Sequence, residues 1–348
     1  MREERFLELL DKMSQVKIAV LGDLFLDRIL YVCRDWDEIS VETGLTAYQI
    51  KRKKCVPGAA GVVTNNLNAL GAGKIYGLGI LSNDGEGYDL EKGLKQTGVD
   101  TSYMIRTDEF FTPTYTKTFF EDEATGRMEE THRLDLKNRK HLTGELEQQI
   151  VRYIRILEEK VDAFVCLEQL EDGDCGIFTS RVREELAKVG ARGKAKVFVD
   201  SRFHIQMFQD VIVKCNDLEA LRSLGWIPEE NESYLLQVDR AVEKLAENRK
   251  QPVVVSCGEA GMKVWDGSAV KTVPAFLTEG EVDICGAGDS ALAGIAAAVC
   301  AGADLVEAAL VGNLVASLIV QQIGVTGVID VERLKQRFYE YEERWKEV

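Results

Sequence analysis

The sequence is poor in histidine and proline, with 3 His and 5 Pro among 348 residues. A zinc site needs several ligands at short spacing, but the 8 Cys lie scattered without a CxxC pair or a neighbouring histidine cluster. This pattern argues against a zinc module. Cysteines that lie singly in apolar stretches favour reduced thiols that pack as small hydrophobic side chains, so we expect a cytoplasmic protein.

Long apolar runs and positive charge are also scarce. No segment approaches the roughly 18 uninterrupted apolar residues of a membrane-spanning helix, and residues 1–13 form a charged amphipathic pattern that differs from a signal peptide. The chain carries 43 Lys and Arg against 58 Asp and Glu, a net charge of −15. Because an acidic protein repels polyanions, we expect no nucleic-acid partner, and the missing apolar run leads us to expect no membrane partner.

Strand and helix patterns alternate along most of the chain. Short apolar runs, such as 16–21 and 163–167, predict buried strands, and helical patterns separate them. This alternation is typical of an α/β fold with a mostly parallel sheet and helices on both faces. Two β-rich stretches, approximately 29–56 and 99–135, predict a small β-sheet lid inserted into it. No low-complexity linker is visible, so residues 1–348 are expected to form a single domain.

The strongest chemical signal is DICGAGDS, residues 283–290, which leads into a small-residue helical pattern. A glycine-rich turn at a helix N-terminus presents backbone N–H groups beside the positive end of the helix dipole. Such a turn can stabilise a phosphoryl group in transfer. Asp289 lies within the turn, where a carboxylate can accept the proton of an attacking hydroxyl. The alternative is a glycine turn whose aspartate only caps the helix.

These residues belong to a longer pattern. DICGAGDSALAG resembles the C-terminal signature of the ribokinase-like (PfkB-type) carbohydrate kinases, DTxGAGDxFxAG. Other family blocks follow along nearly the whole chain: residues 22–27 are similar to GDxxxD, residues 57–72 to the PGGAxN block, residues 216–219 to NxxE, and residues 256–261 to the turn along the nucleotide. Within the family, segments 38–43, 112–114, 133–135 and 197–202 most resemble the heptose-phosphate kinases of the ADP-heptose pathway.

The resemblance implies a ribokinase-like three-layer α/β/α core with a β-sheet lid, and ATP-dependent phosphorylation of a sugar hydroxyl. Asp289 would be the general base, and the amides around Gly286, Ala287 and Gly288 the anion hole. The other implied roles are sugar contacts from Asp23, Asp27, Gly58, Asn66 and Arg133, nucleotide contacts from Asn216, Ser256, Gly258, Gly261 and Asn313, Mg²⁺ held through water by Glu219, and an optional monovalent cation, K⁺, beside Asp283.

These residues also have structural alternatives. Asp23 and Asp27 could be turn or surface carboxylates, Asn216 and Glu219 could cap a helix, and Arg133 could be a solvated lid charge. Asn313 and the turn at residues 324–326, which fall where the family flanks adenine, could serve packing and capping. The half-apolar lid strands imply a homodimer through the lid, as in relatives.

Three departures from the family pattern concern the substrate. Ala59 replaces the second glycine of PGG, and Val62 stands at the usual sugar-contacting Asn. Asp172 stands where a lysine would meet the sugar's phosphate, and a carboxylate there repels a phosphate. We therefore predict a preference for an unphosphorylated sugar or sugar-like polyol. The alternatives are a heptose 7-phosphate kinase and a weakly active sugar- or nucleotide-binding regulator, although an intact Asp289 argues against the regulator.

Overall fold

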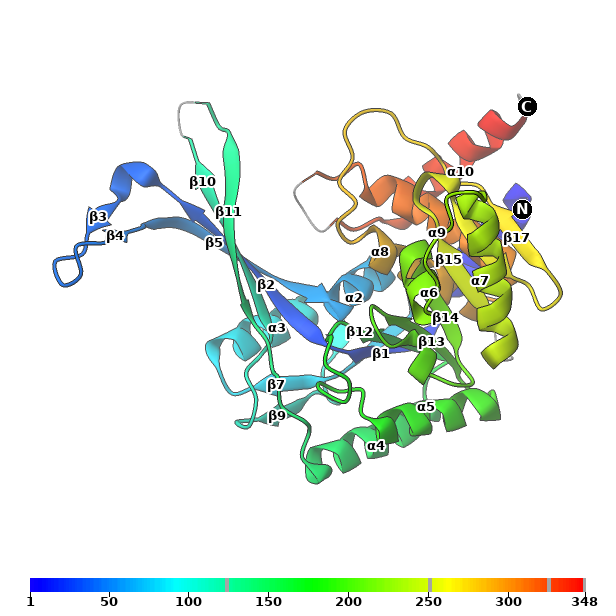
Figure 1. Ribbon diagram of the computed structural model, residues 1–348, viewed down its shortest axis with the longest axis horizontal. Coiled ribbons are helices and arrows are strands. Elements are labelled where there is room, and N and C mark those ends of the chain that lie inside the picture. The colour runs from blue at the N-terminus through cyan, green and yellow to red at the C-terminus, as the bar shows by residue number, and fades with distance from the viewer. Residues whose placement is uncertain (123–124, 250–251, 324–326, 347–348) are drawn as a thin grey trace.

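A nine-stranded sheet forms the centre of the molecule (Figure 1). Its strands are β1 (Lys17–Gly22), β6 (Lys74–Leu78), β8 (Val99–Asp100), β12 (Ala163–Glu168), β13 (Lys196–Ser201), β14 (Ile212–Asn216), β15 (Val253–Ser256), β16 (Met262–Trp265) and β17 (Val270–Val273). The structure is a computed structural model that describes residues 1–122, 125–249, 252–323 and 327–346. The strand order is β17-β16-β15-β14-β13-β12-β1-β6-β8. Pairing is parallel from β8 to β15 and antiparallel at β16 and β17.

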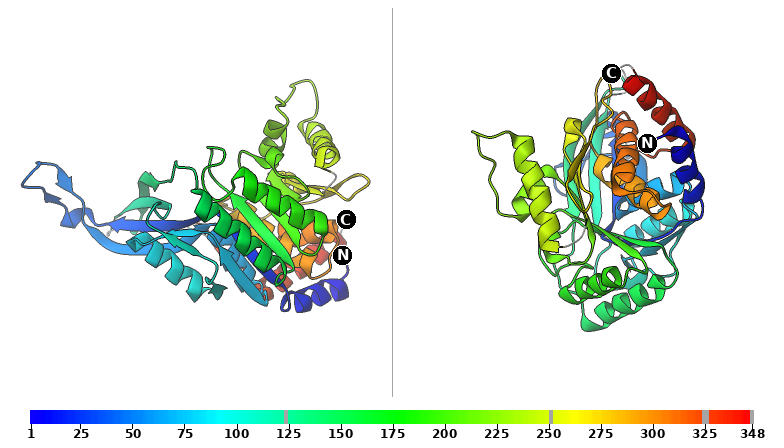
Figure 2. Two further views of the ribbon diagram at one scale, coloured as in Figure 1. Left: turned by 90° about the horizontal axis from the view of Figure 1, so that it is seen from below. Right: turned by 90° about the vertical axis from the view of Figure 1, so that its right-hand side faces the viewer.

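Helices cover both faces of this sheet (Figure 2). One face packs against α1 (Glu3–Met13), α2 (Ala60–Ala69), α3 (Gly85–Gln96), α8 (Ala287–Cys300), α9 (Leu305–Ile319) and α10 (Val331–Lys346). The other face packs against α4 (Gly144–Glu158), α5 (Ser180–Arg192), α6 (Asp217–Ser223) and α7 (Tyr234–Arg249). The predicted three-layer α/β/α architecture is confirmed. No helix in the described ranges combines the length and hydropathy that crossing a membrane requires.

Strand β1 shows how the apolar pattern places the two cores. Successive side chains of a strand point to opposite faces of its sheet. Ile18 and Val20 accordingly belong to the cluster around α8, whereas Ala19 and Leu21 belong to the cluster around α4 and α5. A parallel strand with helices on both sides is apolar on both faces, which explains its uninterrupted hydrophobic run.

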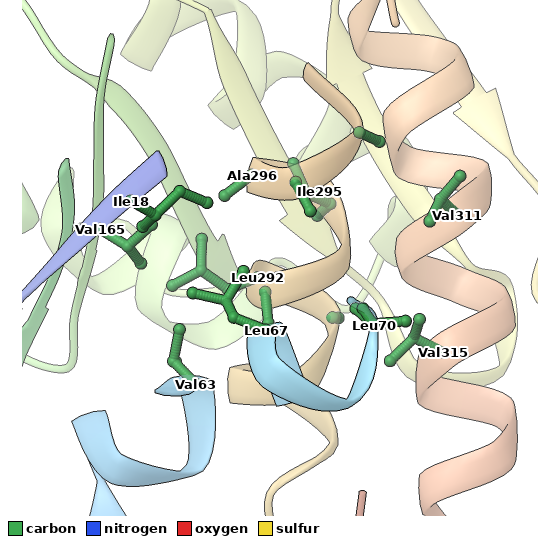
Figure 3. Packing of buried hydrophobic residues seen from close by; sticks show 14 of the residues in the cluster. Ile18, Val63, Leu67, Leu70, Val165, Leu292, Ile295, Ala296, Val311 and Val315 are labelled. Carbon is green, nitrogen blue, oxygen red and sulfur yellow. The ribbon is translucent and has the colours of Figure 1, made fainter. Parts of the chain in front are cut away.

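Helices α8 and α9 form a buried helix pair, and small residues allow their close approach. Figure 3 shows α8 between the strands that carry Ile18 and Val165 and the helix that carries Val311 and Val315. A Cβ atom added to Gly312 would lie 2.7 Å from Ile295 Cγ1. Because close packing leaves no room for displacement, the buried helix pair holds the N-terminus of α8 rigidly.

The lid is a separate four-stranded sheet that projects from the core on the left of Figure 1. Its strands are β2 (Leu24–Val32), β5 (Ile50–Ala59), β10 (Thr114–Glu121) and β11 (Met128–Leu136), in the order β11-β10-β2-β5. Two further pairs are β3 (Glu38–Ile39) with β4 (Thr46–Ala47) at the lid tip, and β7 (Ile80–Ser82) with β9 (Ile105–Thr107) beside the lid. Because β2 begins directly after β1, the lid and the core share one chain segment.

Candidate active site

The turn before α8 presents free backbone amides. Gly286, at φ 77°, occupies the N-cap in the left-handed conformation. The Cys285 N–H donates to Asp283 Oδ1 at 2.9 Å, and the Ala287 N–H donates to the Ile284 carbonyl at 3.2 Å. Within the described ranges, no protein acceptor is found for the amides of Gly286 and Gly288. These two amides, at the positive end of the α8 dipole, are therefore available to an anion.

Asp289 lies in the first turn of α8 and is half-buried. Burial and the charge of Asp200 raise the pKa of this carboxyl to about 7, against the opposing charges of Lys214 and Arg202. A carboxyl with a pKa near neutrality can both accept and release a proton at physiological pH. Asp289 therefore has the position and the proton affinity that a general base needs.

Lys214 and Asp200 form a buried ion pair beside this turn. Lys214 is carried by β14 and Asp200 by the neighbouring β13, and their Nζ and Oδ2 atoms are 2.7 Å apart. A Cβ atom on Gly288 would lie 3.0 Å from Lys214 Nζ. The Lys214 ammonium thus packs against the backbone that carries Asp289.

Asn216 and Glu219 cap the start of α6. The Glu219 N–H donates to Asn216 Oδ1 at 2.8 Å, and Glu219 Oε2 accepts the Asn216 N–H at 2.9 Å. Both residues lie at the carboxyl end of β14, the edge where parallel sheets bind ligands. Burial and the charge of Asp200 raise the pKa of Glu219. Asn216 and Glu219 therefore cap the helix, which was one of the two roles considered from the sequence. The other carboxylate oxygen of Glu219, Oε1, takes no part in the cap.

The turn after β15 contains two glycines with positive φ, Gly258 and Gly261. Gly258, at φ 55°, has no heavy atom within 4 Å of an added Cβ, whereas a Cβ on Gly261 would lie 2.1 Å from the Val273 carbonyl oxygen. The Ser256 hydroxyl donates to the Cys215 carbonyl at 3.3 Å. Asn313 uses its amide to hold the end of β17, donating to the carbonyls of Val273 and Pro274 at 3.0 Å each. Residues 324–326 lie outside the described residues.

Strand register brings a set of charged side chains to one face of the lid. Asp27 lies opposite Tyr115 in the pairing of β2 with β10, and Lys117 lies opposite Arg133 in the pairing of β10 with β11. Residues opposite each other, and every second residue along a strand, share a face. We call this the inner face. The charges of Lys117 and Asp27 act on the Cys285 thiol, so the inner face lies toward the α8 turn.

Asp27 lies against Gly58, which β5 places beside it. A Cβ atom on Gly58 would lie 2.5 Å from Asp27 Cγ, so only glycine fits at position 58 without displacing the carboxyl group. Burial raises the pKa of Asp27 to about 6, although the charges of Lys117 and Arg133 oppose this rise. Asp27 and Gly58 therefore lie together on the lid, as the predicted sugar contacts require.

Asp23 lies elsewhere, under the loop that follows β12. Its carboxylate Oδ2 accepts the Gln169 N–H at 3.1 Å, and a Cβ on Gly176 would lie 2.8 Å from its Oδ1. Only 8% of Asp23 is exposed, and burial raises its pKa to about 7. The structure therefore brings Asp27 to the inner face of the lid but uses Asp23 to hold residues 169–177.

Asn66 and Arg133 also have partners within the protein. Asn66 is buried and donates to Ser290 Oγ at 3.0 Å, so it supports the first turn of α8. Arg133 forms an ion pair with Asp135, 2.8 Å from Nε to Oδ1, and its guanidinium lies 4.7 Å from the centre of the Tyr115 ring. Arg133 is thus on the inner face but is already paired.

Comparison with known proteins identifies the family to which the chain belongs. The profile described as "pfkB family carbohydrate kinase" matches residues 16–331. The chain belongs to the pfkB family of carbohydrate kinases. The family and the ribokinase-like fold agree with the resemblance in the sequence.

Individual relatives and solved structures are also similar to the chain. The chain is 28% identical over 309 residues to "Bifunctional protein HldE" of a Nitratiruptor species, covering 88% of this chain and 62% of that protein. It thus spans less than two thirds of the length of this curated relative. Phosphofructokinase-2 from Escherichia coli in complex with potassium superposes with a TM-score of 0.69 at 17% identity, covering 94% of this chain and 99% of that one. Arabidopsis thaliana ribokinase complexed with ribose and ATP gives 0.66 at 17%, covering 93% and 98%. These two structures show the shared fold.

The pfkB kinases generally use ATP and Mg²⁺, and the donors present here fit both. Among the described residues, no group of three or more His, Cys, Asp or Glu side chains could hold a metal ion directly. Mg²⁺ binds nucleotide phosphates and water with few carboxylates, so the single Oε1 of Glu219 is sufficient. The free amides of Gly286 and Gly288 fit a phosphoryl group. The Asp283 side chain shapes the turn through Cys285, and its backbone N–H donates to the Val320 carbonyl at 2.8 Å.

Sequence reasoning missed two charged residues of this candidate site, Lys214 and Arg202. The charge of each acts on Asp289. The available signal for Lys214 was a lysine between the apolar residues Val213 and Cys215, because lysine is rarely buried unless it is paired. Arg202 follows Asp200 and Ser201 at the end of β13, and its exposure gives no such signal.

Proposed function

We propose that the chain transfers the γ-phosphoryl group of ATP to a hydroxyl of a sugar or sugar-like polyol, with Asp289 as general base. The observation that carries the proposal is the half-buried Asp289 carboxyl next to the free amides of Gly286 and Gly288. Asp289 removes the proton of the acceptor hydroxyl, and the amides stabilise the charge of the transferring group. Bound Mg²⁺ supplies neutralisation of phosphate charge, with Glu219 and Asn216 as the residues that would organise it.

The remaining residues orient the two substrates. On the sugar side we place Asp27 and Gly58, with Lys117 and Arg133 on the same face of the lid. On the nucleotide side we place Gly258 and Gly261, with Ser256 and Asn313 shaping the walls through the backbone. Closure of the lid would exclude water, which limits wasteful hydrolysis of ATP. K⁺ beside Asp283 is part of the proposal as an activator.

Asp172 supports an unphosphorylated substrate. It is exposed in the loop 169–177, where its negative charge disfavours a phosphate. A second candidate is a heptose 7-phosphate kinase. Lys117 and Arg133 on the inner face favour it, because paired cations bind phosphate oxygens. The same lid residues would contact either substrate. The two candidates differ in whether the substrate carries a phosphate, which Asp172 would repel and Lys117 and Arg133 would attract.

A screen of ADP release over free and phosphorylated sugars tests the function. The enzyme would be assayed with Mg²⁺, with and without K⁺, and kcat/KM compared for each sugar. We expect turnover, with the highest kcat/KM for an unphosphorylated sugar or polyol. A phosphorylated heptose with the highest value would select the second candidate. If calorimetry shows that a sugar binds but no sugar causes ATP to be converted to ADP, the protein would instead be a regulator.

We also propose a homodimer through the lid. Apolar side chains at the lid tip are strongly exposed, among them Ile39 at 65%, Val41 at 101% and Leu45 at 70%. A second lid would cover them. Light scattering coupled to size-exclusion chromatography should give a dimer for the wild type and a monomer for Val41→Asp/Leu45→Asp. A monomeric wild type would reject the proposal.

A further inference from the structure

Lys214 is buried beside the turn before α8, in an otherwise apolar part of its strand. Only 4% of Lys214 is exposed, although β14 is otherwise apolar apart from its last residue. Burial alone would lower the pKa of this ammonium, but the Asp200 carboxylate raises it, so Lys214 stays charged. A fixed positive charge is therefore held against the backbone of Gly288.

Stability by itself gives little reason for the buried Asp200–Lys214 pair. Desolvation of two charges offsets most of their attraction, so a buried ion pair often stabilises a fold no better than apolar residues would. The chain has another ion pair with a buried lysine, in which Lys263 on β16 lies 2.8 Å from the half-buried Asp239 on α7. What distinguishes Lys214 is its place beside Asp289.

The charges that face Asp289 come from neighbouring strands and from α6. Asp200 at the end of β13 and Glu219 on α6 disfavour its carboxylate form. Lys214 on β14 and Arg202, just beyond β13, favour it. Among these groups, Lys214 is both buried and in van der Waals range of the turn, and Asp200 is its direct partner.

We propose that Asp200 and Lys214 are a positioning pair for Asp289: Lys214 supports the turn and favours the carboxylate form of the base, and Asp200 holds the ammonium in place and limits its effect. Neither residue touches the reacting atoms. The inference rests on the proposed function, in which Asp289 must be deprotonated to accept the hydroxyl proton.

The two members of the pair should act in opposite directions. Lys214→Met removes a positive charge from beside Asp289, so its carboxylate form becomes less favourable. Asp200→Asn removes a negative charge, while the charges of Asp289 and Glu219 still favour the ammonium form of Lys214, so the carboxylate form of Asp289 becomes more favourable. A purely structural role would weaken folding in both variants and would not separate them by sign.

The experiment measures kcat/KM for the sugar between pH 5 and 9 at saturating MgATP. Activity that needs a deprotonated base rises with pH through an acid limb. We expect that limb to move up by about one pH unit in Lys214→Met and down by about one pH unit in Asp200→Asn, since nearby charges typically shift a carboxyl by 1–3 units. Lys214→Arg should restore the wild-type position. Lys263→Met is the control, which loses a buried, paired lysine away from Asp289 and should keep the acid limb at its wild-type pH.

The outcomes separate this inference from the function on which it rests. Limbs that stay in place, or that move in the same direction in both charge variants, would overturn the positioning pair. If Lys214→Met does not fold, the downward shift in Asp200→Asn decides alone. Full activity of Asp289→Asn would reject the proposed function itself, whatever the profiles of the other variants.

Discussion

The buried helix pair and the lid supply the two halves of the site in contrasting ways. From Ser290 to Val299, the residues of α8 are buried, so the turn before it is fixed by packing. On β11, by contrast, eight of nine residues are exposed, including Arg133. Packing energy positions Asp289 before any ligand binds, whereas the inner face of the lid loses its water only when a ligand covers it. Under the proposed function, the chemistry would therefore be built into the core and sugar recognition would be assembled on the lid.

Asp289→Asn should produce the largest effect on the core side of this comparison. Asn keeps the size and capping ability of Asp but cannot accept the proton, so kcat should fall about 10²–10⁴-fold. Because the pKa of Asp289 is raised to about 7, the folded state binds this proton more tightly than the unfolded chain. The stability contributed by this group is therefore lost as pH rises from about 4 toward 7.

The neutral Asn avoids that loss, so the melting temperature at pH 8 should equal or exceed that of the wild type. Measuring it beside kcat separates catalysis from capping. An active, well-folded Asp289→Asn protein would mean that the aspartate only caps the helix.

Gly312→Ala tests whether packing holds the turn. The added methyl would lie 2.7 Å from Ile295 Cγ1 and 3.2 Å from the Ala291 carbonyl oxygen. Overpacking of this kind costs about 1–3 kcal/mol, measured as a lower midpoint in urea unfolding. Gly85→Ala is the control, because nothing lies within 4 Å of its added methyl. Equal stability of both variants would show that the helix pair is more adaptable than its geometry indicates.

Lys117→Met tests the lid. Loss of a charged contact to the substrate should raise the sugar KM about 10-fold, while the ATP KM and the melting temperature stay unchanged. Lys53→Met is the matched control on the opposite face of the lid, where Lys53 pairs with Asp89 at 3.0 Å. A similar rise in KM for ATP would contradict the division between lid and core.

Ala59→Gly addresses the junction between the lid and the core and should give the smallest effect. Ala59 ends β5 and caps α2 at φ 50°, ψ −118°, a conformation that favours glycine. Glycine should relieve about 1 kcal/mol of strain, seen as a small rise in the melting temperature with kcat unchanged. A fall in stability would show that the alanine conformation is not strained.

The sequence predicts the core better than the site. Apolar runs identified strands such as β1 and β12, and the glycine turn before α8 marked Asp289. Strand β14 escaped prediction because Lys214 interrupts its apolar pattern, and α3 escaped because its three glycines disfavour a helix. The spacing of Asp23 and Asp27 suggested one shared role. The contact in which the Gln169 N–H, 146 residues along the chain, donates to the Asp23 carboxylate could not be predicted, because no local pattern encodes it.

The contact between Gly58 and Asp27 restricts which substitutions can arise at these two positions during evolution. Any side chain at position 58 would displace the Asp27 carboxyl, since its Cβ would lie 2.5 Å from that group. The reverse does not hold, because a smaller residue at position 27 leaves room for alanine at position 58. Across descendants of this chain, loss of Asp27 should therefore precede or accompany loss of Gly58. Lineages that keep Asp27 should be confined to glycine at position 58.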